Sequence, residues 1–200
     1  MTAALELLRS DPALAPVVER AGPYTLRPQP FEHVFEPLAR SVVYQQLSGK
    51  AAATIHGRFV ARFGSDDRPD PVAVASASHE ALREVGLSRR KAEYVQGLAE
   101  AALAGDLPGR GALEALDDET VIERLTALRG IGRWTVEMLL IAWLARPDVL
   151  PVSDLGIRKG MAIIDGLEEL PDPDAMIERA ERWRPYRSTA SWYLWRATES

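Results

Sequence analysis

The chain is 200 residues long, contains no cysteine and carries a formal net charge of −5 at pH 7. Without cysteine it forms no disulfide, no thiolate zinc site and no cysteine-ligated iron–sulfur cluster. The acidic net charge argues against a protein that coats nucleic acid non-specifically, so a DNA footprint would have to be local. The length suits one domain or two closely packed subdomains, and we expect a single domain over residues 1–200.

The sequence predicts neither a targeting segment nor a membrane span. The first nine residues, Met1–Arg9, include Glu6 and lack a long apolar run, which argues against a signal peptide. The longest uninterrupted apolar run, Met138–Ala145, is too short to cross a bilayer. We therefore expect a soluble, cytoplasmic, monomeric chain that has no membrane partner.

Basic residues are unevenly distributed along the chain. Six basic and three acidic residues fall between Arg124 and Gly160. A second basic run, diluted by two glutamates, consists of Arg179, Arg182, Arg184 and Arg187. The acidic net charge is therefore compatible with local contacts to DNA.

Apolar residues recur at helical spacing along most of the chain and predict an all-α protein. The expected helices cover residues 31–47, 49–63, 79–85, 89–104, 118–127, 134–145 and 186–198. Two further helices are expected to begin at Asp154 and at Pro173, and Ser48, Ser78 and Ser88 are expected N-caps. Segments 64–71 and 107–111 are expected to be a loop and a linker, 22–30 a second linker, and no segment alternates as a strand would.

The stretch LRGIGRWT, from Leu128 to Thr135, is the most distinctive part of the sequence. It predicts a tight Gly-x-Gly hairpin, within residues 125–145, that opens an apolar helix at Trp134. Such a turn exposes backbone N–H groups at a helix N-terminus, which is a natural anion site. Asp154 follows 22 residues after Gly132. A phosphate-binding hairpin followed by a carboxylate suggests a protein that holds DNA and acts on it.

Four blocks occur in order along the chain: SVVYQQLS at 41–48, GIGRWT at 130–135, DLGIRK at 154–159, and WRPYRS at 183–188 leading to Trp195. In this order they resemble the helix-hairpin-helix DNA glycosylase superfamily and, within it, the DNA-3-methyladenine glycosylase II family. The likeness runs from about Phe31 to the C-terminus.

The resemblance implies a two-lobed helical fold with a DNA cleft between the lobes. The N-terminal helices and the C-terminal part would form one lobe, and the middle helices the other. Some members carry an extra N-terminal β-domain. It is expected to be absent here, because only about thirty residues precede the first block.

The resemblance also assigns catalysis to Asp154. Separating a damaged base from deoxyribose develops positive charge on the sugar, and a nearby carboxylate stabilises that charge and orients or deprotonates the attacking water. Alternatively, Asp154 is simply the N-cap of the helix that begins at Leu155, and the two roles are compatible. An alkylated purine is already cationic and leaves without a strong general acid, so one carboxylate is enough.

The base pocket implied by the resemblance contains Trp134 and Trp195, with Tyr44 as a weaker candidate. A flipped, positively charged base binds best between electron-rich aromatic faces. Met138 and Leu155 fall where some relatives carry tyrosine, which suggests a less aromatic and roomier pocket. The other tryptophans, Trp143, Trp183 and Trp192, are expected to pack in the core.

Trp134 also decides the expected subtype. In superfamily members that also cut the DNA backbone, a lysine at this helix position forms a Schiff base with the sugar. The tryptophan here predicts an enzyme that removes the base without lyase activity.

The hole left by the flipped base needs a wedge, which the family places in the turn after its first conserved helix. The resemblance favours Gln46 as the wedge, with Leu47 and Ser48 beside it. Alternatively, Gln45 and Gln46 only make hydrogen bonds at the end of a helix.

Residues 130–133 are the expected phosphate contact. Backbone N–H groups around Gly130 and Gly132 would hold a phosphate of the lesion strand, with Ile131 and Arg133 in the same segment. In relatives a monovalent cation bound by hairpin carbonyls assists this contact, and no side chain can confirm that ion here. Lys91 is expected to be solvated at a helix start rather than bound to phosphate.

The expected function is hydrolytic excision of alkylated purines, of the 3-methyladenine and 7-methylguanine type, from double-stranded DNA in base excision repair. The alternatives are a helix-hairpin-helix glycosylase for an oxidised or deaminated base, and a non-catalytic protein that binds DNA structures. No cofactor is expected. No metal bound by side chains is expected either, since His33, His56 and His79 lack metal-ligand spacing.

Overall fold

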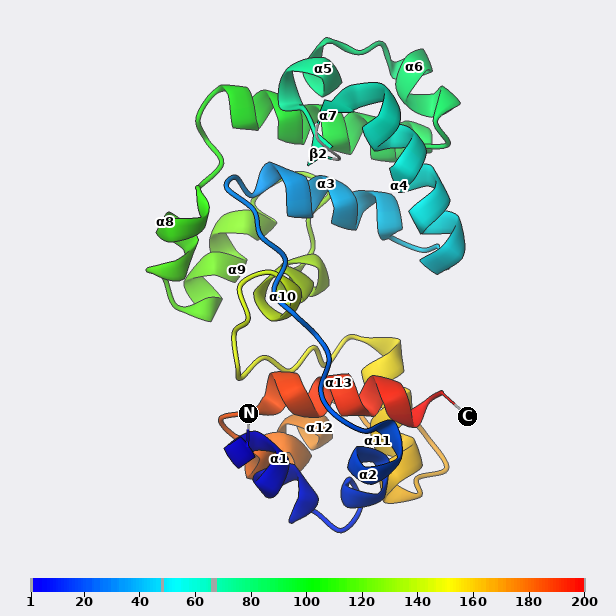
Figure 1. The fold of residues 1–200 in the computed structure, drawn as a ribbon, viewed down its shortest axis with the longest axis vertical. Coiled ribbons are helices and arrows are strands. Elements are labelled where there is room, and N and C mark those ends of the chain that lie inside the picture. The colour runs from blue at the N-terminus through cyan, green and yellow to red at the C-terminus, as the bar shows by residue number, and fades with distance from the viewer. Residues whose placement is uncertain (1, 48, 66–67, 200) are drawn as a thin grey trace. The chain divides into compact units, whose positions relative to one another are not determined.

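A computed structural model of the chain describes residues 2–47, 49–65 and 68–199. The described residues are mainly helical (Figure 1), which confirms the all-α prediction. Two short strands of two residues each, β1 (Gly64–Ser65) and β2 (Arg68–Pro69), pair antiparallel in the segment predicted to be a loop. Ser48, the expected N-cap and DNA contact, lies outside the described residues.

The chain divides into two units. Unit 1 comprises Met1–Pro28 and Leu140–Ser200, and unit 2 comprises Gln29–Leu139. The membership of the two units agrees with the expectation that the N-terminal helices and the C-terminal part form one lobe and the middle helices the other.

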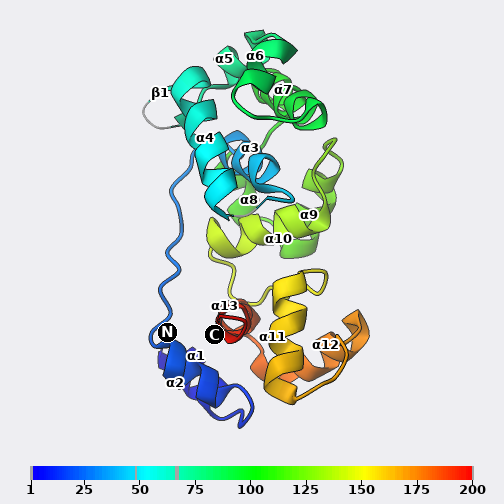
Figure 2. The ribbon, with the colours of Figure 1, turned by 90° about the vertical axis from the view of Figure 1, so that its right-hand side faces the viewer.

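Unit 1 contains both the N-terminal helices and the C-terminal helices of the chain. Its helices are α1 (Thr2–Arg9), α2 (Ala15–Ala21), α11 (Leu155–Asp165), α12 (Pro173–Ala180), the 3-10 turn η1 (Glu181–Trp183) and α13 (Arg187–Ala197). Figures 1 and 2 show α13, in red, packed beside α11 and the blue helices α1 and α2. Trp183 and Tyr193 are fully buried in the core that these helices share, and Trp192 and Trp143 are also buried, as the sequence predicted.

The close approach of α11 to α13 depends on Gly160. A Cβ built at Gly160 would lie 2.1 Å from the backbone oxygen of Leu194, far inside van der Waals contact. Because this glycine has no side chain, the two helices pack almost backbone to backbone.

A buried ion-pair network ties the turn between α1 and α2 to the C-terminal helices. The carboxylate of Asp11 accepts hydrogen bonds from Arg179 at 2.6 Å and from the indole Nε1 of Trp183 at 2.8 Å. Arg179 also pairs with Asp165 at 2.8 Å. Burial by itself raises the pKa of Asp11, but the hydrogen bonds from Arg179 and Trp183 outweigh it and hold the pKa below its usual value. The network gives the N-terminal segment a fixed place in unit 1.

Unit 2 is built around α7. Its helices are α3 (Phe35–Tyr44), α4 (Gly49–Phe63), α5 (Pro71–Ser76), α6 (His79–Glu84), α7 (Arg89–Leu103), α8 (Arg110–Glu114) and α9 (Asp118–Thr126). Helices α3, α5 and α6 all pack on α7. Ser78 and Ser88 cap α6 and α7 as predicted, while Asp70 and Asp117 cap α5 and α9.

Two helices depart from their predicted bounds by three residues or more at one end or both. Helix α3 begins at Phe35 and not at Phe31, because Pro37 has no N–H for a helical hydrogen bond and is tolerated only in a first turn. It ends at Tyr44 because the next residues leave helical geometry. Helix α10 (Arg133–Ala142), within which the two units meet in sequence, stops before Ala145, whose φ of +54° is left-handed.

Sequence periodicity also missed the short helices α5 and α8, which lie in or beside the predicted loop and linker segments. The linker predicted at 22–30 contains no helix or strand. Within the described part of the chain, no helix is long and apolar enough to cross a membrane.

Candidate functional site

Asp154 occupies the N-cap of α11 in unit 1. Its Oδ1 accepts the backbone N–H of Ile157 at 2.8 Å, so the capping role that the sequence left open is present. The same oxygen accepts the indole Nε1–H of Trp195, on α13, at 2.9 Å. Two N–H donors from different helices therefore orient one carboxylate, which is more than a cap requires.

Gly156 makes room for this contact. A Cβ at Gly156 would lie 2.8 Å from Cδ1 of Trp195 and 3.1 Å from Oδ1 of Asp154. Trp195 and Asp154 are both half-buried, and Leu155 beside them is 53% exposed. Unit 1 thus brings together three of the predicted residues, Asp154, Leu155 and Trp195.

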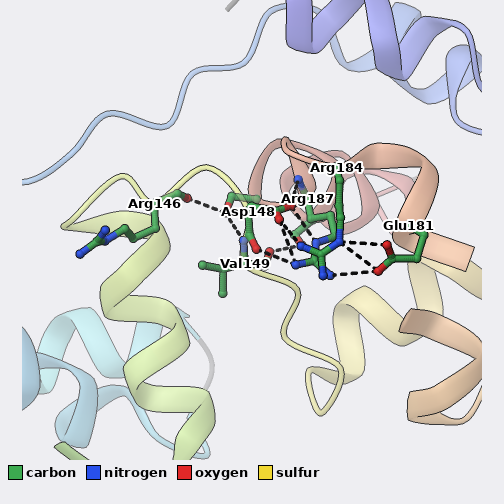
Figure 3. A network of polar contacts seen from close by, with 8 residues as sticks. Arg146, Asp148, Val149, Glu181, Arg184 and Arg187 are labelled. Carbon is green, nitrogen blue, oxygen red and sulfur yellow. Dashed lines mark hydrogen bonds and ion pairs between the residues drawn. The ribbon is translucent and has the colours of Figure 1, made fainter. Parts of the chain in front are cut away.

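The loop that leads towards Asp154 is anchored at its start by a cluster of charges (Figure 3). The carboxylate of Asp148 accepts hydrogen bonds from Arg187 at 2.7 Å and from Arg184 at 2.6 Å, and Arg184 also binds Glu181 at 3.0 Å. In Figure 3 the side chain of Arg146 points away from this group.

Ser188, in the first turn of α13, fixes the backbone of the same loop. Its hydroxyl donates to the carbonyl of Arg146 at 2.6 Å and accepts the N–H of Val149 at 2.9 Å. Two arginines of the second basic run therefore serve to hold the loop, and Arg179 of that run pairs with Asp11 and Asp165.

The Gly-x-Gly hairpin lies between α9 and α10 in unit 2. Gly130 has a φ of +88°, and a Cβ there would lie 2.4 Å from the ring of Tyr94, so both conformation and space require glycine. Ile131 is buried, and Gly132 has no atom near the place of its missing Cβ. The N-terminus of α10 follows directly. The first N–H groups of a helix have no acceptor within it, and here those of Thr135 and Val136 donate to the carbonyl of Gly132.

Hairpin carbonyls already bind protein donors. Gly130 accepts the Gln45 amide, Leu128 accepts the N–H of Ile131, and Gly132 accepts the N–H of Thr135. A carbonyl oxygen has two lone pairs, so a monovalent cation at the carbonyls of Leu128 and Gly130 is compatible with these bonds and stays a prediction. Among the described residues, no three histidine, aspartate or glutamate side chains gather in a way that could hold a metal ion.

Trp134 and Met138 lie one turn apart on α10, and both are half-buried. Arg133 forms ion pairs with Glu119 and, at 3.0 Å, with Glu137. Its guanidinium is held by carboxylates of unit 2, while its role in DNA binding stays a prediction.

The turn after α3, residues 45–47, is here called the wedge loop. Gln46 has a left-handed φ of +57°, and its side chain and that of Leu47 are exposed. Gln45 points inward: its Nε2 donates to the carbonyl of Gly130 at 3.2 Å and to Oγ1 of Thr135 at 3.4 Å. Gln45 therefore makes hydrogen bonds to the hairpin and to the first turn of α10, while the role of Gln46 stays a prediction.

Lys91 is neither solvated at a helix start nor aimed at phosphate, so the expectation for this residue is wrong. Its ammonium donates to the carbonyls of Val43 and Gln45, both at 2.8 Å, at the end of α3. Burial lowers the pKa of Lys91 below its usual value. No sequence pattern links Lys91 to residues 46 and 48 positions away, which is why sequence reasoning missed the contact.

Tyr44, the weaker pocket candidate, packs against side chains of α3 and α4. The guanidinium of Arg40 lies 4.6 Å from the centre of its ring, and the ring of His56 lies 5.9 Å away, edge to face. Burial, and next the charge of Arg40, lowers the pKa of His56 to about 4. His56 is thus a packing residue, while His33 and His79 are exposed.

Comparison with known proteins places these features in a family. A family model described as HhH-GPD superfamily base excision DNA repair protein matches residues 39–185. DNA-3-methyladenine glycosylase 1 of Schizosaccharomyces pombe is 40% identical over 165 residues, which cover 82% of this chain and 72% of that protein.

Solved structures are similar over nearly the whole chain. The S. pombe 3-methyladenine DNA glycosylase Mag1, in complex with abasic DNA, matches with a TM-score of 0.89 and 35% identity, covering 99% of this chain and 97% of that one. A DNA-3-methyladenine glycosidase from Bacillus halodurans matches with a TM-score of 0.79 and 38% identity, covering 96% and 86%.

The two hairpin glycines are expected to differ sharply when replaced by alanine. Gly130→Ala combines a strained φ with a clash against Tyr94 and should lower the free energy of unfolding by about 1–3 kcal/mol. Gly132→Ala, the matched control, meets open space and should change it by less than about 1 kcal/mol. Urea unfolding of both variants measures this, and equal losses would contradict the hairpin geometry.

Proposed function

The chain belongs to the HhH-GPD superfamily of base excision DNA repair proteins, and we propose that it is a DNA glycosylase that excises alkylated purines from double-stranded DNA. The observation that carries the proposal is the carboxylate of Asp154, oriented by Trp195 and by the N-terminus of α11. The names of its relatives, which are 3-methyladenine DNA glycosylases, support the substrate class.

In the proposed reaction, a water attacks the anomeric carbon of a nucleotide flipped out of the stack. The N-glycosidic bond breaks, and its electron pair neutralises the positive charge of the alkylated base, which leaves as a neutral molecule. The proton of the water passes to Asp154 or to solvent. Positive charge on the sugar peaks in the transition state, where the Asp154 carboxylate stabilises it.

One carboxylate suffices for this class of substrate. A neutral base needs a proton from a general acid as it departs, whereas an alkylated purine carries its charge already. We therefore propose that Asp154 acts without a catalytic acid partner, and that 3-methyladenine and 7-methylguanine are substrates.

Base and phosphate contacts are assigned to the residues that the structure leaves accessible. We propose Trp195, Trp134 and Met138 as contacts of the flipped base, because each of these residues is only half-buried. Gln46 is the proposed wedge, since its side chain is exposed on the wedge loop. The hairpin amides would hold a phosphate through the helix dipole of α10.

Hydrolysis without lyase activity is expected because Trp134 stands where lyases carry a nucleophilic lysine. Borohydride should trap no covalent adduct between the enzyme and DNA that contains 7-methylguanine. Strands should break only after treatment with alkali or an abasic-site endonuclease. Denaturing gels of both reactions test this, and a trapped adduct at stoichiometric yield would overturn the subtype.

Asp154→Asn should separate catalysis from capping. The asparagine Oδ1 can still accept the N–H groups of Ile157 and Trp195, so the melting temperature should change little. Loss of the negative charge should slow single-turnover release of 7-methylguanine by about 10²–10³-fold or more.

The matched control is Asp172→Asn. Asp172 caps α12 in the same unit through the N–H of Ala175, at 2.8 Å, without an indole donor. This variant should excise 7-methylguanine at the wild-type rate. An Asp154→Asn enzyme that melts normally and works within a few-fold of wild type would show that Asp154 is only a cap.

A further inference from the structure

The wedge loop and the hairpin are joined by one side chain. The Gln45 amide spans the two segments within unit 2, donating to the carbonyl of Gly130 and to the hydroxyl of Thr135. Thr135 is 2% exposed, and Gly130 is fixed by its close approach to the Tyr94 ring. Both groups that accept from Gln45 are therefore closely packed.

A second tie holds the wedge loop from its other side. The ammonium of Lys91, on α7, donates to the carbonyls of Val43 and Gln45, which the end of α3 leaves without helical partners. Lys91 thus links the residue before the wedge to the central helix of unit 2.

Gln46 needs such support. A left-handed φ is unfavourable for a residue with a Cβ and persists only where the surroundings enforce it. The backbone on the N-terminal side of Gln46 is held by Lys91, and the side chain of the preceding residue is held by the hairpin. These contacts fix the position of the Gln46 backbone, from which its exposed side chain extends.

We propose that Gln45 and Lys91 are positioning residues that hold the wedge and the phosphate-binding hairpin as one rigid element. When the hairpin binds a phosphate, Gln46 then meets the base stack at a fixed distance from that phosphate. Phosphate binding and base flipping therefore occur together. This inference rests on the proposed function, because it needs a flipped base and a wedge.

The test compares Gln45→Met with Gln96→Met. Both remove a glutamine amide that donates two hydrogen bonds within unit 2: Gln96 Nε2 donates to the carbonyls of Ala75, in α5, and Ala77, which follows it, at 3.1 and 3.0 Å. A purely structural role would make the two variants alike. Each is measured by thermal melting and by single-turnover excision of 7-methylguanine from a paired duplex at saturating enzyme.

Gln45→Met should slow excision from paired duplex by about 10- to 100-fold, the loss expected when a positioning contact is released. The loss should shrink when the same lesion lies opposite a mismatched base, because an unpaired base flips at little cost. Gln96→Met should excise at the wild-type rate on both duplexes. Lys91→Met should follow Gln45→Met, and Lys91→Arg should restore part of the rate.

A double variant adds a second readout. If Gln45 acts through the wedge, the effects of Gln45→Met and Gln46→Ala should not multiply. The double variant should slow excision by much less than the product of the two single fold-losses. Should Gln45→Met unfold, Gln45→Asn replaces it, since its shorter side chain stays polar but cannot reach Gly130 from the same backbone.

The outcomes separate the two claims. A wild-type enzyme that releases no methylated purine refutes the proposed function. A wild-type enzyme that releases it, with Gln45→Met equal to Gln96→Met or with an equal loss on mismatched DNA, overturns the positioning role alone.

Discussion

The hydrogen bond from the Trp195 indole to Oδ1 of Asp154 is the interaction on which the candidate catalytic group depends. It joins the last helix of the chain to the N-terminus of α11, and two glycines make it possible. Gly160 lets α11 and α13 approach through their backbones, and Gly156 leaves space for the indole beside the carboxylate. A carboxylate held in this way keeps one orientation as charge develops opposite it, which is how preorganised groups stabilise a transition state.

Much of the positive charge of this chain is used within the protein. Arg179, Arg184 and Arg187 pair with carboxylates of unit 1, and Arg133 pairs with carboxylates of unit 2. This use of arginine agrees with a net charge of −5 and with DNA binding through backbone amides at the N-terminus of α10. If the hairpin amides bind phosphate as proposed, contact through a few fixed dipoles would leave the protein weakly attached to undamaged DNA.

Local patterns made much of the fold predictable. Ser78 and Ser88 as caps, Asp154 before α11, the buried Trp183 and Trp192, and the division of the chain into two units all follow from spacing or from the family likeness. The ends of α3 and α10 do not follow from such patterns, because Pro37 and the left-handed residues Gln46 and Ala145 determine them. The contacts of Gln45 and Lys91 were out of reach, since each joins residues more than forty positions apart.

The most direct test of the account is wild-type base release from a panel of duplexes under single-turnover conditions. The panel holds cationic lesions, 3-methyladenine and 7-methylguanine, beside the neutral lesions hypoxanthine, uracil and 8-oxoguanine. Because one carboxylate without a general acid suits a base that is already charged, the cationic purines should be released fastest. Faster release of an oxidised or deaminated base, or binding without any release, would contradict the account.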